Sequence, residues 1–546
     1  MICPRLLRRI IARTEMVLTT GAEELLQHLA EVGFKVCFSN PGTTEAHVMA
    51  AFDNTPEIRP VLCLHETVAT GAADGYARLS QEPALTLLHL GPGLANGLAN
   101  LHNARRAGSA ILNLVGEMSS WHRKQDPLLN CDIRQLATAI GANFYEISSR
   151  DSLVSETQAA TQQMLSDLPR QRRCQPVVLT LPHDYSWEQG SAARVEPSSA
   201  PSRALRSTAA AKAAILLGGS ALLADGRPLQ NAGRIAAATG CHLICENAFA
   251  RLDRGPHVPC PERLAYFPQE AAAQLRKYSV VLVIGMRKPV AMFGYRGGPS
   301  ELLDLPDEAI WEFDDDDASP AAILEMLADQ VAPKALPQKL QASSGPMTSL
   351  PSPGSLTKLT AGAMCAILVQ HQPEGAILVD ESLTSGGAYW EAAKAAPSFT
   401  HLTLTGGAIG SGPPLALGAA LACPDRRVIN LQADGSAMYS MQALWSQARE
   451  KTNVVTIICA NQEYAILKVE MARQQACSSL TPGMVMQMRP SRLLTDIGTP
   501  RIDWVSLAHG MGLDLATRAT TCRDFEQQLA AALKHQGPSL IEAVLK

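Results

Sequence analysis

Short apolar runs alternate with segments of helical periodicity along most of this 546-residue chain. Gly21 to Gly33 has the helical pattern, with Leu25, Leu26 and Leu29 on one face. The apolar runs between such segments have strand length, and this alternation is typical of an α/β fold built from doubly wound parallel sheets. The predicted strands are Lys35–Phe38, Val61–Leu64, Ala84–Leu90, Ala110–Val115, Val177–Leu181, Ala214–Leu217, Val280–Ile284, Gly375–Asp380, Val428–Leu431 and Asn453–Cys459.

Two stretches interrupt the pattern and divide the chain. Ser191 to Ser207 is rich in Ser, Ala and Pro, and Lys334 to Ser355 is rich in Pro, Ser and Gln. Both have the composition of linkers, and a chain of this length has room for about three domains. We therefore predict an N-terminal extension over residues 1–16 and three doubly wound domains over residues 17–190, 207–333 and 356–546.

The stretch from Gln432 to Leu467 carries the clearest candidate chemistry. One predicted strand ends just before Asp434-Gly435-Ser436, a helical pattern follows from Met441 to Glu450, and the next strand ends before Asn461-Gln462-Glu463. A strand–helix–strand crossover places both strand ends at the same edge of a parallel sheet, where open α/β sheets bind ligands. A carboxylate, an amide oxygen and a backbone carbonyl at that edge suit Mg²⁺ held together with phosphates.

This stretch resembles the diphosphate-binding motif of thiamine diphosphate (ThDP) enzymes, in which GDG is followed downstream by NN. The sequence ADGSAMYSMQALW is most similar to that of benzoylformate decarboxylase and its relatives. The chain departs from the motif at Ala433 and Ala460, neither of which removes a metal ligand. The resemblance implies metal ligation by Asp434, Asn461 and the carbonyl of Glu463, and cofactor contacts from Gly435, Ser436 and Tyr464.

Glu66, in LHETVATGAADGYAR, matches the glutamate that hydrogen-bonds the aminopyrimidine ring of ThDP in this family. Taken alone, a glutamate at this position is an ordinary first-turn carboxylate, favoured by the helix dipole. The ADGYAR sequence that follows it and the motif at Asp434 favour the cofactor-binding interpretation.

Two further positions follow from the same resemblance. Asn40 to Glu45, NPGTTE, is similar to a benzoylformate decarboxylase loop and places Thr43 against the substrate carboxylate. His89 stands where that family has an active-site histidine, a residue that can relay protons near neutral pH. The alternative for His89 is a histidine satisfied within the core. We expect His65 and His102 to be structural.

The segment Gly406 to Gly410 resembles the family loop in which Ile409 would be the apolar wedge under the cofactor. One departure concerns the middle domain, where Gly294 stands at the position of a second active-site histidine in benzoylformate decarboxylase. The substrate is therefore not expected to be benzoylformate itself. Some relatives bind FAD in the middle domain, but no motif of this chain supports FAD.

Three functions fit these motifs. The first is a ThDP- and Mg²⁺-dependent decarboxylase that converts a small 2-oxo acid through an enamine intermediate. The second is a carboligase similar to acetolactate synthase, but the Phe-Gln pair and the QWQ-like tryptophan of those enzymes are missing from His122–Ile133 and Lys468–Ala476. The third is a non-catalytic protein of the same fold, against which the intact Glu66, Asp434 and Asn461 argue.

Composition and charge exclude several other classes of protein. Hydrophobic residues make up 46% and charged residues 18% of the chain, as in ordinary globular α/β proteins. A formal charge of −4 without a basic block argues against a nucleic-acid partner, and no apolar run reaches the roughly 18 residues of a membrane span. Thirteen cysteines without CxxC pairs indicate a reducing compartment, which we take to be the cytoplasm.

Residues 1–15 contain four arginines and no acid before Glu15, which fits either a mitochondrial-type presequence or an extension before Met16. We favour the extension, because the segment is short and lacks serine. In related enzymes the cofactor bridges the first domain of one subunit and the last domain of another. The resemblance therefore implies a homo-oligomer, a dimer or a homotetramer, with each site built from two chains.

Overall fold

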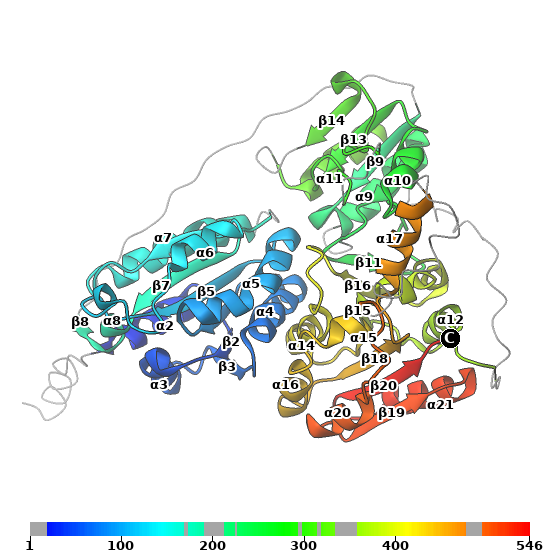
Figure 1. Cartoon of the computed structure of the whole chain (residues 1–546). Helices are drawn as coiled ribbons and strands as arrows, with labels where there is room; N and C mark the ends of the chain where they lie inside the picture. Colours follow the sequence, from blue (N-terminus) through cyan, green and yellow to red (C-terminus); the bar gives the residue numbers. More distant parts are fainter. Residues whose placement is uncertain are drawn as a thin grey trace, which may run out of the picture.

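The computed structural model describes residues 19–168, 173–190, 212–223, 227–292, 298–313, 318–332, 357–476 and 494–546. The N-terminal extension, both linkers and Gly294 lie outside the described residues. Figure 1 shows three α/β units in chain order, coloured blue to cyan, green, and yellow to red. The predicted fold class, three doubly wound α/β units with parallel sheets, is confirmed.

The first sheet has six parallel strands in the order β3-β2-β4-β5-β7-β6. Its strands are β2 (Val36–Asn40), β3 (Arg59–Leu62), β4 (Ala84–Leu88), β5 (Ile111–Glu117), β6 (Asn143–Glu146) and β7 (Val177–Pro182). The accompanying helices are α2 (Gly21–Glu31), α3 (Ala46–Ala51), α4 (Glu66–Ser80), α5 (Leu90–Ala107), α6 (Ile133–Ala139), α7 (Leu153–Asp167) and α8 (His183–Trp187). Two short strands, β1 (Thr19–Thr20) and β8 (Gln189–Gly190), pair antiparallel and close the unit.

The middle unit has five parallel strands in the order β12-β10-β9-β13-β14. These are β9 (Ala213–Leu217), β10 (His242–Cys245), β12 (Glu262–Arg263), β13 (Val280–Ile284) and β14 (Ile310–Phe313), with helices α9 (Pro228–Thr239), α10 (Pro268–Leu275) and α11 (Pro320–Val331). Strand β11 (Leu252–Arg254) lies in the same part of the sequence but pairs antiparallel with β16 of the third sheet.

The third sheet has seven strands in the order β11-β16-β15-β17-β18-β20-β19. Its own strands are β15 (Ile377–Glu381), β16 (Phe399–Thr403), β17 (Val428–Ala433), β18 (Val454–Ala460), β19 (Leu515–Ala519) and β20 (Ser539–Val544). Its helices are α12 (Ala361–His371), α13 (Tyr389–Ala392), α14 (Gly412–Ala422), α15 (Asp434–Ala437), α16 (Ala443–Arg449), α17 (Ala465–Ala476), α20 (Trp504–Gly510) and α21 (Cys522–Lys534). Ala433 is in register with Cys459, so β17 and β18 end side by side.

Most predicted strands are present within one or two residues. The sequence did not predict β6, β10, β12, β14, β16, β19 and β20, or the short strands β1, β8 and β11, and among the predicted segments the main difference is the start of α5. The sequence predicts a strand through Leu90 that ends in Gly91-Pro92-Gly93, whereas the helix already begins at Leu90. Pro92 fits the first helical turn because amide groups there have no intrahelical acceptor. His89 therefore lies at the junction of strand and helix.

The first and third units share an apolar core along α4 and α14, which lie side by side in Figure 1. The helices approach closely through small residues: a Cβ at Gly418 would lie 1.9 Å from the carbonyl oxygen of Ala72, and one at Gly75 would lie 2.2 Å from that of Leu415. Leu417 and Ala443 of the third unit belong to one buried cluster with Val68 of α4. This contact fixes the N-terminus of α4 relative to the loop that precedes α14.

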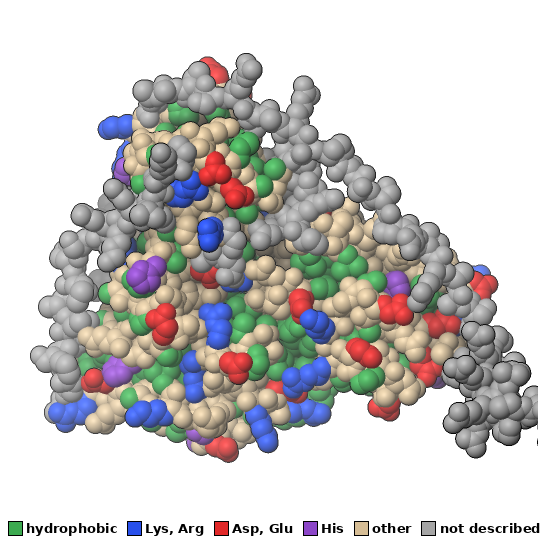
Figure 2. Space-filling model, turned by 180° about the vertical axis from the view of Figure 1, so that it is seen from behind, with side chains coloured by type: hydrophobic (Ala, Val, Ile, Leu, Met, Phe, Trp, Pro, Cys, Tyr) green, Lys and Arg blue, Asp and Glu red, His purple; other side chains and the backbone are tan. Residues whose placement is uncertain are grey.

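The surface and the cysteines add two observations. On the face shown in Figure 2, Lys and Arg side chains are interspersed with Asp and Glu side chains. Within the described ranges every cysteine is free, and no helix there is long and apolar enough to cross a membrane.

Candidate active site

Asp434 lies where β17 turns into α15, and its side chain is buried. Its Oδ1 accepts the N–H of Gly435 at 2.8 Å, and its Oδ2 accepts the N–H of Gln462 at 2.7 Å. Burial raises the pKa of the Asp434 carboxyl, and the backbone amides that it accepts oppose this shift. No ion pair to Asp434 is formed within the part of the chain that the structure describes. A buried carboxylate of this kind suits a bound cation.

Asn461 directly follows β18, and its Oδ1 accepts the N–H of Glu463 at 3.1 Å. Glu463 forms an antiparallel bridge with Asp496 in which its two neighbours make the hydrogen bonds. The N–H and C=O of Glu463 therefore face away from that segment. The predicted closeness of Asp434 and Asn461 is present, since Gln462 between Asn461 and Glu463 binds Asp434 directly.

The turn after Asp434 leaves no room for side chains larger than those present. A Cβ at Gly435 would lie 2.5 Å from Cε1 of Tyr464. Ser436 is buried, donates to the carbonyl of Ala433 at 3.2 Å and accepts from Nε2 of Gln432 at 2.9 Å. A glycine under an aromatic ring beside oxygen donors fits a diphosphate with its magnesium ion.

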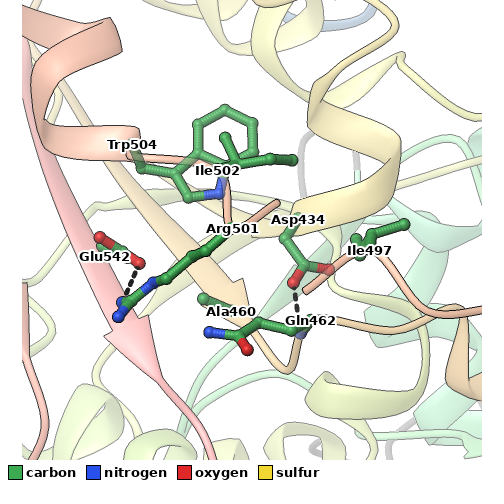
Figure 3. A pocket seen from close by; sticks show the side chains of 8 residues that line it. All are labelled: Asp434, Ala460, Gln462, Ile497, Arg501, Ile502, Trp504 and Glu542. Atoms are coloured by element: carbon green, nitrogen blue, oxygen red, sulfur yellow. Dashed lines mark hydrogen bonds and ion pairs between the residues drawn. The ribbon is translucent and has the colours of Figure 1, made fainter. Parts of the chain in front are cut away.

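A small cavity opens beside Asp434 (Figure 3). Among its lining residues is Glu542, which is 1% exposed and accepts from Arg501 at 2.6 Å and from Arg518 at 2.7 Å. Figure 3 shows the Arg501 side chain turned toward Glu542. This arginine is therefore engaged by another carboxylate and does not neutralise Asp434.

Glu66 is the first residue of α4 and is 8% exposed. His65 caps the helix, because its Nδ1 accepts the N–H of Thr67 at 3.1 Å. Asn96 of α5 donates from Nδ2 to Oε2 of Glu66 at 3.1 Å. The carboxylate is thus oriented by an amide from a neighbouring helix, and His65 has the structural role expected of it.

His89 lies at the end of β4, and its Nδ1 is 2.8 Å from Oε2 of Glu45. Glu45 is 1% exposed and also accepts the N–H of Gly42 at 2.7 Å and the hydroxyl of Thr44 at 2.6 Å. With these donors around the carboxylate, the Nδ1–H tautomer is the one that can bind Glu45. Nε2 of His89 is then the nitrogen that can exchange a proton. Thr43 is exposed, two residues before Glu45.

Gly93 lies close to both Glu66 and His89. A Cβ at Gly93 would lie 3.1 Å from Oε1 of Glu66 and 3.5 Å from Cβ of His89. The two candidate acid–base residues therefore both lie close to Gly93, in the first turn of α5.

The loop from Gly406 to Gly410 connects this half of the site with the Asp434 half. Asn103 of α5 binds both the carbonyl of Ala408, at 2.8 Å, and its N–H, at 3.2 Å. Gly410 has φ +93°, and a Cβ there would lie 2.4 Å from Cβ of Tyr439, in the turn that follows Asp434. Ile409 is half-buried between these two contacts. His102 also holds this loop, with Nε2 3.1 Å from the carbonyl oxygen of Gly406, a structural role as expected.

Three residues of the site were not predicted from the sequence: Glu45, Asn96 and Glu381. Glu45 accepts the N–H of Gly42 as the glutamate of a capping box does, but glycine lacks the Ser or Thr side chain of that pattern, so the sequence carries no clear signal for it. Asn96 and Glu381 carry no local signal, because their partners are far away in the sequence. Glu381 ends β15 and accepts two N–H groups from the loop before α14.

Comparison with known proteins agrees with this geometry. Residues 19–136 match the thiamine pyrophosphate enzyme N-terminal TPP binding domain, and residues 385–543 match the C-terminal TPP binding domain. A Mycobacterium tuberculosis protein that carries the name acetolactate synthase large subunit IlvX is 42% identical over 96% of this chain and 99% of its own. Benzoylformate decarboxylase from Pseudomonas aeruginosa is 27% identical over 93% of this chain and 96% of its own.

Among solved structures, the ThDP-dependent 4-hydroxybenzoylformate decarboxylase of Rhodococcus jostii superposes with a TM-score of 0.78 at 25% identity, covering 97% of this chain and 99% of that one. The chain belongs to the family of thiamine diphosphate-dependent enzymes. Its relatives within that family are decarboxylases and acetolactate synthases.

Proposed function

We propose that this enzyme is a ThDP- and Mg²⁺-dependent decarboxylase of a small 2-oxo acid. The observation that carries the proposal is the placement of Glu66 and His89 close to the same residue, Gly93, with His89 held by a buried carboxylate. A decarboxylase needs one group for the cofactor and a second group that delivers a proton after CO₂ leaves.

The Asp434 half binds the charged end of the cofactor. Asp434, Asn461 and the carbonyl of Glu463 would ligate Mg²⁺, and Gly435, Ser436 and Tyr464 would surround the diphosphate. When bound, ThDP supplies the carbanion chemistry that releases CO₂ from a 2-oxo acid. The support for the metal is the chemistry of the donor set: three hard oxygen ligands, one of them a buried carboxylate that forms no ion pair among the described residues.

The Glu66 half performs the proton transfers. Glu66, oriented by Asn96, would hydrogen-bond the aminopyrimidine ring, and Ile409 would support the cofactor from below. His89 would exchange a proton at Nε2 while Glu45 keeps its ring in place. Thr43, exposed at the start of the same loop, would contact the substrate carboxylate.

The alternative is a carboligase that joins two 2-oxo acids, and one observation favours it. The relative with 42% identity carries the name of an acetolactate synthase large subunit. Against it stands the absence of the Phe-Gln pair and of the tryptophan that those enzymes use, from segments 122–133 and 468–476. The two enzymes differ in what receives the acyl unit that remains after CO₂ has left. In the decarboxylase it is a proton, and in the carboligase it is a second 2-oxo acid.

The deciding experiment is incubation of the purified protein with ThDP, Mg²⁺ and a panel of 2-oxo acids, with quantification of CO₂ and of the organic product. A decarboxylase forms one aldehyde per CO₂ from each 2-oxo acid. A carboligase forms one 2-hydroxy-3-oxo acid per CO₂ and consumes two 2-oxo acids. The variant Asp434→Ala serves as the inactive control, and product formation by neither route in the wild type would refute the proposal.

We further propose that the working unit is a homodimer or homotetramer in the cytoplasm. The first and third units already touch within one chain along α4 and α14. A site that draws Glu66 and Asp434 from two different chains therefore stays a prediction, and it has its own test in the Discussion.

A further inference from the structure

Glu381 is a buried carboxylate that neither half of the proposed mechanism uses. It ends β15 and is 2% exposed. Its Oε1 accepts the N–H of Gly410 at 2.6 Å, and its Oε2 accepts the N–H of Gly412 at 2.5 Å. These amides lie on either side of Ser411, where the loop that carries Ile409 enters α14. One side chain therefore holds the end of this loop at two points.

The same carboxylate is linked to the turn after Asp434. Nε2 of Gln432, which is fully buried, donates to Oε2 of Glu381 at 3.2 Å and to Oγ of Ser436 at 2.9 Å. Hydrogen bonds thus run without interruption from Gly410 and Gly412, through Glu381 and Gln432, to Ser436. The side chains of Glu381 and Gln432 thus link the loop to the turn, in addition to the close approach of Gly410 and Tyr439.

The charge at this position is not explained by an ion pair. In the ranges that the structure describes, no Lys, Arg or His forms an ion pair with Glu381, and burial raises the pKa of its carboxyl to about 7. Burying an unpaired carboxylate costs stability, so a residue that only filled space would be cheaper as an apolar side chain. A glutamine is no substitute, because it offers one acceptor oxygen and would turn its NH₂ group toward the second N–H.

We infer that Glu381 is a positioning residue, which holds the loop carrying Ile409 in register with the turn that follows Asp434. The inference rests on the proposed function in one respect, because it takes Ile409 and Ser436 to contact the same cofactor. It goes beyond that function because it couples the two contacts. Through Glu381 and Gln432, the position of Ile409 under the cofactor depends on the position of Ser436 beside the diphosphate.

The direct test is amide hydrogen–deuterium exchange at Gly410 and Gly412 in the protein without cofactor, resolved to single residues by mass spectrometric fragmentation. We expect Glu381→Gln to speed exchange at one or both amides about tenfold or more, because a charge-assisted hydrogen bond is lost. The control is Glu391→Gln, an exposed residue of α13, which should leave both amides unchanged. Glu381→Asp keeps the charge but cannot reach both amides, so it should speed exchange at one of them at least. If Glu381→Gln does not fold, Glu381→Asp provides the test.

The second readout is C2–H/D exchange of ThDP at saturating concentration, which a merely structural defect would not change selectively. We expect it to slow about tenfold in Glu381→Gln, in line with one lost charge-assisted hydrogen bond. If the wild type does not bind ThDP but exchange at Gly410 and Gly412 still depends on Glu381, the proposed function fails, whereas the positioning of the loop by Glu381 is supported. Unchanged exchange at Gly410 and Gly412 in both Glu381 variants, or unchanged C2 exchange in a ThDP-binding enzyme, overturns the inference.

Discussion

Oε2 of Glu45 lies 2.8 Å from Nδ1 of His89, although the residues belong to different strand–helix connections, 44 positions apart. The carboxylate is 1% exposed, and a Cβ at Gly116 would lie 1.7 Å from its Oε1. The pair therefore lies between the connections that follow β2 and β4 and the end of β5. A buried carboxylate thus holds the half-buried ring of His89, which is how a histidine keeps a single ring orientation.

We expect His89→Ala to slow turnover by about 10²–10⁴-fold, the usual effect of losing a general acid–base group. Glu45→Gln should slow turnover as well, and the double variant should be no slower than His89→Ala, because both changes remove the same function. The measurement is kcat on the substrate found in the 2-oxo acid panel, with the exposed Glu57→Gln as control. Additive losses in the double variant would show that the two residues act independently.

Glu66→Gln should bind ThDP with near wild-type affinity and lose most activity. The residue acts on the protonation of the aminopyrimidine and is oriented by Asn96, so the loss should appear in kcat rather than in cofactor affinity. C2–H/D exchange of bound ThDP measures this step directly. Wild-type exchange rates in Glu66→Gln would remove Glu66 from the proton transfer.

Asp434→Ala should abolish Mg²⁺-dependent binding of ThDP and leave the fold intact. Even outer partners of a metal ligand change affinity by about 10–100-fold, so loss of the carboxylate itself should exceed that range. Isothermal titration with ThDP and Mg²⁺ gives the affinity, and Asp425→Ala, exposed before β17, is the matched control. Equal affinities in wild type and Asp434→Ala would contradict the metal assignment.

Glu381 should make the fold more stable in acid than near neutral pH. Its pKa is raised from 4.5 to about 7 in the folded chain, so between these values the folded state binds more protons than the unfolded state. The free energy of unfolding should then fall by about 3 kcal/mol as the pH rises through this window, and level off above it. The groups that contact Glu381 are backbone amides and Gln432, which do not titrate.

The measurement for Glu381 is the difference between wild type and Glu381→Gln in denaturant unfolding at several pH values. This difference cancels the other carboxylates, provided that unfolding is reversible. A difference that does not vary between pH 4.5 and 7 would mean that Glu381 is ionised throughout, as in an ordinary exposed position.

A complementation experiment tests whether each active site is formed by one chain or by two. Chains carrying only Glu66→Gln are mixed with chains carrying only Asp434→Ala, after dissociation and reassembly. If each site draws these residues from two chains, a heterodimer contains one site with both lesions and one with neither. Each heterodimer should recover about half of the activity of a wild-type dimer, since one of the two sites of a closed symmetric dimer is intact. The homodimers of either variant in the same mixture stay inactive.

The contact of α4 with α14 inside one chain allows the opposite result. If Glu66 and Asp434 of one site come from the same chain, every site of the mixture carries one lesion and the mixture stays inactive. Different affinity tags on the two variants, with sequential purification on both tags, provide the control that heterodimers have formed.

The sequence predicted strands such as β4, β5 and β18 because they are buried on both faces and appear as continuous apolar runs. It did not predict partly exposed strands such as β6, β14 and β19. It also predicted that Asp434 and Asn461 lie together, since this follows from the topology of a crossover alone. Both predictions depend only on patterns that extend over neighbouring residues. They would hold for any sequence with the same alternation of strands and helices.

The sequence did not predict contacts that join distant segments. The pairs formed by Glu45 with His89, Asn96 with Glu66 and Glu381 with the loop amides depend on how separate connections meet at a sheet edge. The start of α5 was placed too late because Gly91-Pro92-Gly93 has turn composition, although proline is tolerated in a first helical turn. Single positions carry no periodicity from which such contacts could be inferred.

The position of strand β11 limits where the chain can be divided into exchangeable units. Its three residues, Leu252 to Arg254, come from the middle of the chain but complete the edge of the third sheet beside β16. Removing or exchanging the middle unit as a cassette would leave the backbone of β16 unpaired at an open edge, a known route to aggregation. Shuffling between homologous enzymes should therefore carry β11 along with the third unit, and a crossover point that ignores this strand should yield insoluble chimeras.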